Sequence, residues 1–428
     1  MADAATLRKN FLWNTFGQIT YLMCQFLCGI FVVRLAGTQQ SGLYNVALTV
    51  TNIFLSLASY GMYSFQVSDA SDKYSASCYI RSRMYTCGAA VLACAAYTVF
   101  YVLTGKYGPM QSVCIVLFLI YRMVESATDI YNAIDQKHER LDIVGKTYAM
   151  RGVSSLAVFI LTLVATKSIL LTLALMALAN IALFAFYTLP KAAPFYSRQP
   201  VQGTAVKNLL YECLPLAAYS VLSTTTTSIP RLVLSNVCGE EALGIYNPVT
   251  QPVMLLQVCA TYLFNPFITT FSVSYYENDR KRFYRAVINV QAILLAMLPA
   301  GLIVAQVLGR WGLAVFVGAG MEEYHALLAP MVVSAVLTAT NLFYSMILTV
   351  MRGMKSLLAA NLLGIVVAFF VSRPCVLQWE MQGATVAAII AQLAQLTMLL
   401  ICVMRQSHAH FRDGFMPKPE DPFDGLPS

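Results

Sequence analysis

The chain has 428 residues, of which 58% are hydrophobic and 11% are charged, and its formal net charge is +8. Soluble domains carry about 25% charged residues, so this composition excludes a soluble protein and indicates an integral membrane protein. The positive charge does not indicate nucleic-acid binding, because no soluble segment carries a basic face interleaved with aromatic residues.

Twelve segments are long and apolar enough to cross a membrane, since a spanning helix needs about 20 mainly apolar residues. In chain order they are residues 11–36, 43–67, 84–104, 110–134, 144–166, 168–189, 208–236, 243–273, 284–308, 326–352, 355–378 and 382–405. The first segment is too long for the core of a removable signal peptide and is expected to be the first span. Most of the 28 Lys and Arg residues fall in loops on one side, which predicts that both termini are cytoplasmic.

A polar stretch in the middle of the chain divides the spans into two halves of six. We predict an N-terminal six-helix bundle at 1–190, a cytoplasmic linker at 191–207, a C-terminal six-helix bundle at 208–405 and a polar cytoplasmic tail at 406–428. Because six is an even number, both halves enter the membrane in the same direction, which predicts a parallel repeat. The sequence supports this repeat, since SGLYN at 41–45 returns as LGIYN at 243–247, each opening the second span of its half.

Polar side chains recur every three or four residues along several spans, and such spacing places them on one face of a helix. The clearest case is span 110–134, with Arg122, Glu125, Asp129 and Asn132. Charged groups cannot face lipid, so we predict that these faces line a water-filled cleft between the halves. The candidate lining residues are Asn14, Gln18, Gln25, Asn45, Asn52, Asn132, Gln251 and Asn341. For small polar residues, the alternative is that they only hold neighbouring helices together.

Four arginines lie within or at the ends of predicted spans, namely Arg34, Arg122, Arg151 and Arg231. A charge at the centre of a spanning helix costs roughly 2.5–3.5 kcal/mol, so each needs a partner, a cavity or a function. Guanidinium groups bind phosphate through two N–H groups at once, so we predict that the four form a basic patch for a phosphate-bearing or otherwise anionic substrate.

Each of these arginines also has a structural interpretation. Arg122 lies one helical turn from Glu125, and the two side chains can neutralise each other. Arg34 and Arg231 can extend to the outer membrane interface, and Arg151 can anchor its helix at the inner one.

Asp129 lies one turn further toward the cytoplasm than Glu125 and is then left as the spare acid of its span. A carboxylate in a partly dehydrated cavity can exchange a proton near neutral pH. We therefore predict that Asp129, helped by Glu125, couples transport to protons.

The motifs of an enzyme or a nucleotide-driven pump are missing. GKT at 145–147 lacks the earlier glycine of a phosphate-binding loop, since position 140 is Arg140. The four histidines form no HExxH, and the eleven cysteines, which form no CxxC pair, are expected to pack as small hydrophobic residues. We expect no enzymatic activity, no metal and no cofactor.

The stretch NFLWNTFGQITYLMCQFLCGIFVVRLAGTQQSGLYNVALTVTNIFLSLASYGMY at 10–63 resembles the opening of bacterial polysaccharide transporters, and SIPRLVLSNVCGEEALGIYNP at 228–248 also looks like that family. These are oligosaccharide flippases of the multidrug/oligosaccharidyl-lipid/polysaccharide exporter superfamily. The resemblance implies a MATE-like, V-shaped, all-α protein of two six-helix bundles that alternately open to each side. Arg34 and Arg231 match the family's arginines of the first and seventh spans.

The resemblance also implies a substrate, a location and partners. The substrate is an oligosaccharide repeat unit on polyprenyl pyrophosphate, moved from the inner to the outer leaflet of the bacterial cytoplasmic membrane for capsule, exopolysaccharide or O-antigen synthesis. Membrane lipid, a polysaccharide polymerase and other assembly proteins are the expected partners of a monomeric flippase. The alternatives are an ion-coupled multidrug exporter, a lipid II flippase and a non-transporting scaffold of a polysaccharide assembly complex.

Overall fold

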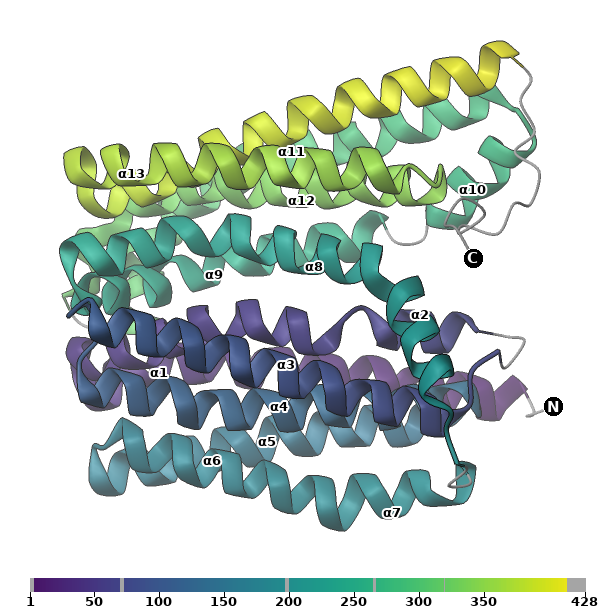
Figure 1. Ribbon diagram of the computed structural model, residues 1–428. Helices are drawn as coiled ribbons and strands as arrows, with labels where there is room; N and C mark the ends of the chain where they lie inside the picture. The colour runs from purple at the N-terminus through teal and green to yellow at the C-terminus, as the bar shows by residue number, and fades with distance from the viewer. Residues whose placement is uncertain (1–3, 70–72, 197–199, 265–266, 319, 414–428) are drawn as a thin grey trace. The chain divides into compact units, whose positions relative to one another are not determined.

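The computed structural model describes residues 4–69, 73–196, 200–264, 267–318 and 320–413, and throughout these ranges its regular structure is helical, without a strand (Figure 1). The prediction of an all-α protein is confirmed. The chain forms two compact units: residues 1–224 with 239–245 make unit 1, and residues 225–238 with 246–428 make unit 2. Their boundary falls inside a helix and not in the stretch 191–207, and the predicted domain division stays a prediction.

The helices follow the predicted spans in order. They are α1 (Ala4–Ser59), α2 (Met62–Ser68), α3 (Ala76–Leu103), α4 (Pro109–Lys137), α5 (Leu141–Thr166), α6 (Ile169–Leu183), α7 (Leu189–Ala192), α8 (Gly203–Cys238), α9 (Glu240–Phe264), α10 (Ile268–Tyr276), α11 (Arg280–Gly312), α12 (Leu328–Val350) and α13 (Met354–Asp413). A π-helical turn at Phe184–Thr188 joins α6 to α7. Among the described residues, each predicted span corresponds to one helix or to consecutive helices, and residues 265–266 of span 243–273 lie outside the described part of the chain.

Two of the helices are long enough to cross a membrane twice. α1 is interrupted at Gly37, where φ is 83°, and α13 at Glu380, where φ is 47°. Among the described residues, seven helical stretches are long and apolar enough to cross a membrane. Two of them, Lys9–Val67 and Met354–Arg412, have 59 residues each and contain these breaks. The remaining predicted spans fall in α4, α8 and α9, whose charged, polar or proline residues lower their apolarity. The chain is therefore a multi-pass membrane protein.

Glycine allows α1 and α5 to pack with their backbones in contact. A Cβ atom on Gly17 would lie 1.9 Å from the carbonyl oxygen of Gly145, and one on Gly145 would lie 2.1 Å from that of Trp13. A Cβ on Gly152 would lie 2.9 Å from the Cα of Tyr21. Small residues drive this kind of approach between membrane helices, where lipid provides no hydrophobic force to join them.

The two copies of the sequence repeat meet inside unit 1. A Cβ on Gly42 would lie 2.4 Å from the carbonyl oxygen of Glu240, and one on Gly244 would lie 2.4 Å from that of Thr38. The Ser41 hydroxyl donates to the carbonyl of Gly244 at 2.7 Å. The repeated glycine thus has the same use in both copies, which is to let the two segments touch.

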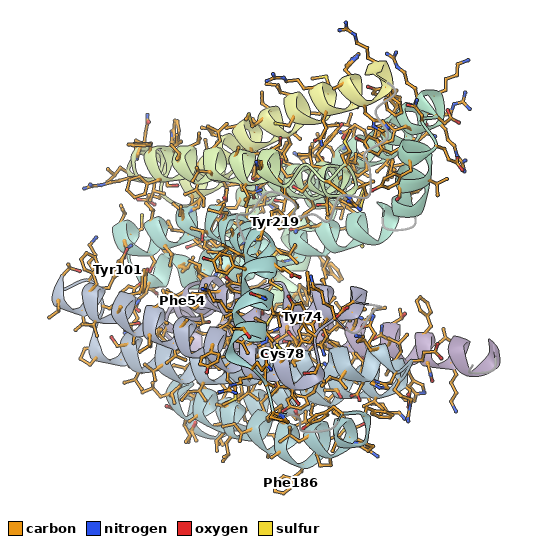
Figure 2. The ribbon with its side chains drawn as sticks, turned by 45° about the vertical axis from the view of Figure 1, so that its right-hand side comes forward. Phe54, Tyr74, Cys78, Tyr101, Phe186 and Tyr219 are labelled. Atoms are coloured by element: carbon orange, nitrogen blue, oxygen red, sulfur yellow. The ribbon has the colours of Figure 1, made fainter. Side chains whose placement is uncertain are left out.

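Unit 1 has a buried apolar cluster between its helices and large apolar side chains exposed on its outside. One buried cluster joins the start of α8 to α2, α3 and α4 through Met62, Tyr74, Cys78, Tyr79, Ile130, Val206, Leu209 and Cys213. Figure 2 shows Tyr74 and Cys78 inside this region and Phe186 projecting outward, and Phe186 is 84% exposed. An outward apolar side chain of this size is what a lipid-facing surface requires.

We expect Gly145→Ala to destabilise the protein by about 1–3 kcal/mol, because the added methyl group would overlap backbone atoms that cannot move aside. The matched control is Gly88→Ala in α3, where a Cβ has no neighbour within 4 Å. That substitution should be neutral or slightly stabilising, because alanine favours a helix over glycine. Thermal unfolding in detergent measures both variants, and equal melting temperatures would contradict the tight α1–α5 contact.

Candidate functional site

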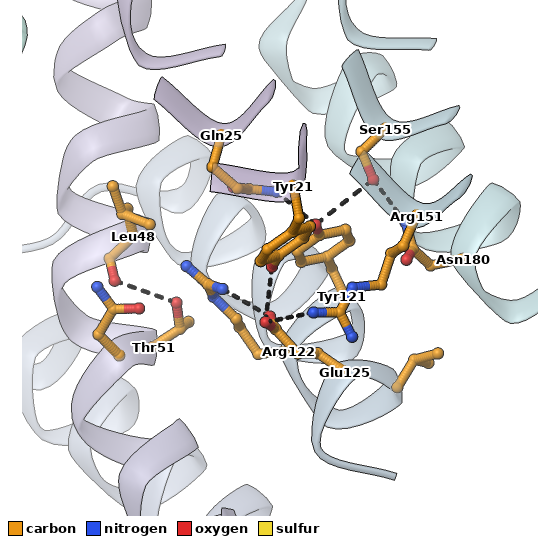
Figure 3. A network of polar contacts seen from close by, with 12 residues as sticks. Tyr21, Gln25, Leu48, Thr51, Tyr121, Arg122, Glu125, Arg151, Ser155 and Asn180 are labelled. Carbon is orange, nitrogen blue, oxygen red and sulfur yellow. Dashed lines mark hydrogen bonds and ion pairs between the residues drawn. The ribbon is translucent and has the colours of Figure 1, made fainter. Parts of the chain in front are cut away.

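A buried carboxylate joins three helices of unit 1 (Figure 3). Glu125 on α4 accepts a hydrogen bond from Nη1 of Arg122 at 2.6 Å, and from Nη2 of Arg151 on α5 at 2.9 Å. The Tyr21 hydroxyl on α1 donates to the same carboxylate at 2.6 Å. Arg151 is only 2% exposed, so this is a charge cluster within the bundle and not an interface anchor. The predicted pairing of Arg122 with Glu125 is confirmed.

Aromatic and amide side chains enclose this cluster. The guanidinium of Arg151 lies 4.4 Å from the ring centre of Tyr21 and 5.3 Å from that of Tyr148, so both rings face its charge. Gln25 on α1 donates to the hydroxyl of Tyr121 on α4 at 2.9 Å. Further along, Asn180 on α6 donates to the Ser155 hydroxyl at 3.0 Å. The network therefore ties α1, α4, α5 and α6 together.

Two guanidinium groups share one carboxylate here, so the cluster keeps a single net positive charge. Both cations donate to Glu125, and their positions are set by that acid rather than by an open cavity. Hydrogen bonds to charged groups inside a bundle stabilise it only while every partner is present.

Asp129 lies one turn beyond this cluster on α4 and is half-buried. The charges of Arg151, Glu125 and Arg83 all act on its carboxylate. Within the described part of the chain no basic side chain forms an ion pair with it, in contrast to Glu125. Its role in proton coupling stays a prediction.

Arg83 on α3 is a charged residue that the sequence analysis did not recognise as an interior group, because it precedes its predicted span by one residue. It is 3% exposed, and its Nη1 donates to the hydroxyl of Ser126 at 3.0 Å and to the carbonyl of Ala58. The i, i+3 spacing of Arg83 with Thr86, another buried polar residue, was the available signal.

The predicted lining residues of unit 1 have various surroundings. Gln18 donates to Asn14 at 3.2 Å, and Asn45 donates to the carbonyl of Ser41 at 2.9 Å. Asn132 is buried, and neither its amide nitrogen nor its oxygen has a hydrogen-bond partner among the described residues. Asn52 is half-buried on α1.

Arg34 lies apart from the Glu125 cluster. It is exposed on α1, about 20 Å along the helix from Tyr21 at 1.5 Å per residue. The structure therefore brings together Arg122 and Arg151 of the four predicted cations.

Unit 2 contains a polar cavity of about 190 Å³ around Arg231. Its polar lining residues are Thr227, Arg231, Tyr246, Thr250, Gln257, Ser334, Thr338 and Gln392. Gln392 on α13 donates to the Thr338 hydroxyl at 2.8 Å and accepts from Ser334 at 3.1 Å, both on α12. These bonds hold α12 and α13 together where both helices line the Arg231 cavity.

The Arg231 cavity has an uncompensated charge. No carboxylate is among the residues that line it, and none of the described acids forms an ion pair with Arg231. A guanidinium in such surroundings favours an anion as its partner. Of the other predicted residues of unit 2, Asn341 donates to the backbone of Gln392 at 3.1 Å, and Gln251 is half-buried on α9.

Residues 7–272 match the model of a family described as polysaccharide biosynthesis protein. A capsular polysaccharide biosynthesis protein of Staphylococcus aureus, CapF, is 24% identical over 280 residues, which cover 64% of this chain and 68% of that protein.

Solved structures show the same fold. The inward-facing form of a multidrug resistance MATE family transporter of the MOP superfamily has a TM-score of 0.68 at 12% identity, covering 92% of this chain and 96% of that one. The lipid II flippase MurJ in an inward closed conformation has a TM-score of 0.66 at 13% identity, covering 97% and 94%. The family match confirms the resemblance to polysaccharide biosynthesis proteins, and the solved structures confirm the MATE-like fold class.

We expect Glu125→Gln to lower the free energy of unfolding by about 3–5 kcal/mol, because it leaves two buried guanidinium groups without their counter-charge. The control is Glu323→Gln, since Glu323 is exposed and a surface change of this kind usually stays within about 0.5 kcal/mol. Denaturation in detergent compares the two, and similar losses would show that the Glu125 cluster does not hold the bundle together.

Proposed function

Because the chain belongs to the polysaccharide biosynthesis protein family, we propose that it is a flippase for an oligosaccharide linked to polyprenyl pyrophosphate. It moves this lipid from the inner to the outer leaflet of a bacterial cytoplasmic membrane by alternating access, for capsule, exopolysaccharide or O-antigen synthesis. Both termini face the cytoplasm, and the protein works with a polymerase and other assembly proteins.

The observation that carries this proposal is the acid-free cavity around Arg231. A pyrophosphate that crosses the membrane interior loses its hydration, so it needs cationic donors on its way. Arg231 offers a guanidinium, and Gln257, Thr338 and Gln392 add neutral groups that can hydrogen-bond to sugar hydroxyls. Of the other predicted substrate cations, Arg34 is exposed, whereas Arg122 and Arg151 are buried and paired with Glu125, so these two add positive charge to the bundle rather than a direct contact with the substrate.

The charge pattern disfavours a multidrug exporter as the second candidate. A cationic drug needs an acidic site, whereas Glu125 is already shared by two arginines, Asp129 lies in the field of Arg151 and Arg83, and the Arg231 cavity has no acid among its lining residues. A scaffold without transport activity has no need of a cationic cavity inside its helices.

The proposed flipping is driven by the proton gradient, and Asp129 is the residue that binds and releases the coupling proton. Asp129, like Asp135 further along α4, forms no ion pair with a basic side chain of the described chain, while Glu125 is held as a counter-ion next to Asp129. Protonation of Asp129 would change the charge beside Arg151 and Arg83, and so would favour a different arrangement of α3, α4 and α5.

Flipping of a fluorescent polyprenyl-pyrophosphate glycan in proteoliposomes tests the proposed function. We expect Arg231→Ala to slow flipping roughly 10–100-fold, because a hydrogen bond to a charged group contributes about 1.5–3 kcal/mol. Arg231→Lys should be intermediate, since lysine keeps the charge without the two-pronged geometry. The control is Arg373→Ala, an exposed arginine of α13 that should leave the rate unchanged.

Two results would count against this function. Wild-type proteoliposomes that do not flip the glycan would favour a scaffold, as would failure to restore surface glycan in a flippase-null strain. Equal rates in Arg231→Ala and Arg373→Ala would remove Arg231 from the substrate path.

We expect Asp129→Asn to abolish the acceleration of flipping by an imposed proton gradient, because an asparagine side chain does not bind or release a proton near neutral pH. Flipping without a gradient should persist. Rates measured with and without the gradient, in wild type and variant, test this, and full gradient dependence in Asp129→Asn would exclude Asp129 as the coupling residue.

A further inference from the structure

Unit 2 contains a second cavity, of about 470 Å³, whose lining is apolar. The residues that shape it come from α9, α11, the turn after α11 and α12, and they include Val253, Leu256, Gly301, Trp311, Gly312 and Val332. Trp311 is 60% exposed, so the groove is open along the outer side of α11. We call this cavity the α11 groove.

Glycines of α11 show where this helix packs closely on its neighbours and where the groove is open. A Cβ on Gly301 would lie 2.9 Å from Val332 and 3.3 Å from Leu256, and one on Gly309 would lie 2.7 Å from Leu328. α11 therefore packs tightly at these two points. At Gly312 a Cβ would meet nothing within 4 Å, so the groove is open where the helix ends.

The α11 groove adjoins the Arg231 cavity. Val253 on α9 lines both cavities, and its neighbours alternate, with Met254 in the Arg231 cavity and Leu255 in the groove. On α12, Met331 and Val332 divide in the same way. α9 and α12 thus form a wall with a cationic cavity on one side and an apolar groove on the other.

The wall is weakened by proline. Pro248 and Pro252 lie inside α9, and proline removes a backbone N–H and kinks a helix. Pro252 lines the groove directly beside Val253, at the point that the two cavities share. The wall is therefore easiest to open where a ligand would have to pass from one cavity to the other.

We propose that the two cavities form one two-part site for a polyprenyl phosphate lipid, with the phosphate at Arg231 and the isoprenoid chain in the α11 groove. The site rests on the proposed function, and it names where the tail of the substrate is held. The chemistry is complementary on both sides of Val253, with a guanidinium for the anion and a mainly apolar groove for the isoprenoid chain.

An ordinary phospholipid fits this site less well. Arg231 lies seven residues before α8 ends at Cys238, about 10 Å inside the helix at 1.5 Å per residue. Phospholipid headgroups stay at the membrane interface, and moving a charge into the interior is costly. A lipid whose phosphate is carried through the membrane is the ligand that brings an anion to this depth.

Trp311 provides the measurement. The chain has three tryptophans, so the variant Trp13→Phe/Trp379→Phe keeps Trp311 alone. The full-length variant is reconstituted in vesicles of brominated phosphatidylcholine, whose acyl chains quench exposed tryptophan. Undecaprenyl phosphate is then added, and we expect a saturable recovery of Trp311 fluorescence as the prenyl chain displaces brominated chains from the groove.

Two substitutions in this background separate head from tail. Arg231→Gln should raise the concentration for half-recovery by about tenfold or more, because the phosphate loses its charged donor. Gly312→Leu should raise it similarly, because the new side chain enters open groove space without a clash. The control is Gly88→Leu in α3, also without a Cβ neighbour within 4 Å, which should titrate like its parent. Thermal unfolding confirms that all variants are folded.

The proposal is overturned if undecaprenyl phosphate gives no recovery, if undecaprenol without phosphate is equally effective, or if Arg231→Gln titrates like its parent. The first result would mean that bulk lipid keeps the groove, and either of the other two would mean that Arg231 does not hold the phosphate of a lipid bound there. Recovery of Trp311 fluorescence does not require flipping. A protein that shows the recovery but does not flip the glycan would refute the proposed function and leave the site standing.

Discussion

The cost of a charge in an apolar interior determines most of what is distinctive in this protein. Inside a bilayer, an ionised side chain without a partner costs several kcal/mol, so each interior arginine must find an acid, hydrogen-bond acceptors or a hydrated cavity. Arg122 and Arg151 find Glu125, and Arg83 finds a carbonyl and a hydroxyl. Arg231 has a cavity without an acid, and this difference separates its chemistry from that of the others.

The two kinds of arginine suit different tasks. A cation held by a buried carboxylate is fixed in position and contributes to the integrity of α1, α4 and α5. A cation without a counter-charge keeps its capacity for an external anion. The same residue type therefore serves packing in unit 1 and ligand binding in unit 2, and the acid beside it decides which.

Much of the fold was predictable from the sequence, because membrane-spanning helices follow from hydropathy alone. The Arg122–Glu125 pair was also predictable, since residues three apart share a helix face. The bond from Arg151 to Glu125 was not, because it joins α5 to α4, and the third partner of Glu125, Tyr21, comes from α1, which packs closely on α5. Gly17 and Gly145 set that packing, and no pattern within either helix reveals that the two glycines meet. The α11 groove was hidden for the same reason, since a cavity is a property of three helices together.

The contact between Gly42 and Gly244 has an evolutionary consequence. The sequences of duplicated halves normally diverge, because each copy accumulates substitutions independently. At this point each copy's backbone is the other copy's neighbour, so a side chain introduced on one side is rejected by the other. A substitution at either glycine is therefore limited by the backbone of the other copy, and this steric constraint favours glycine at both positions.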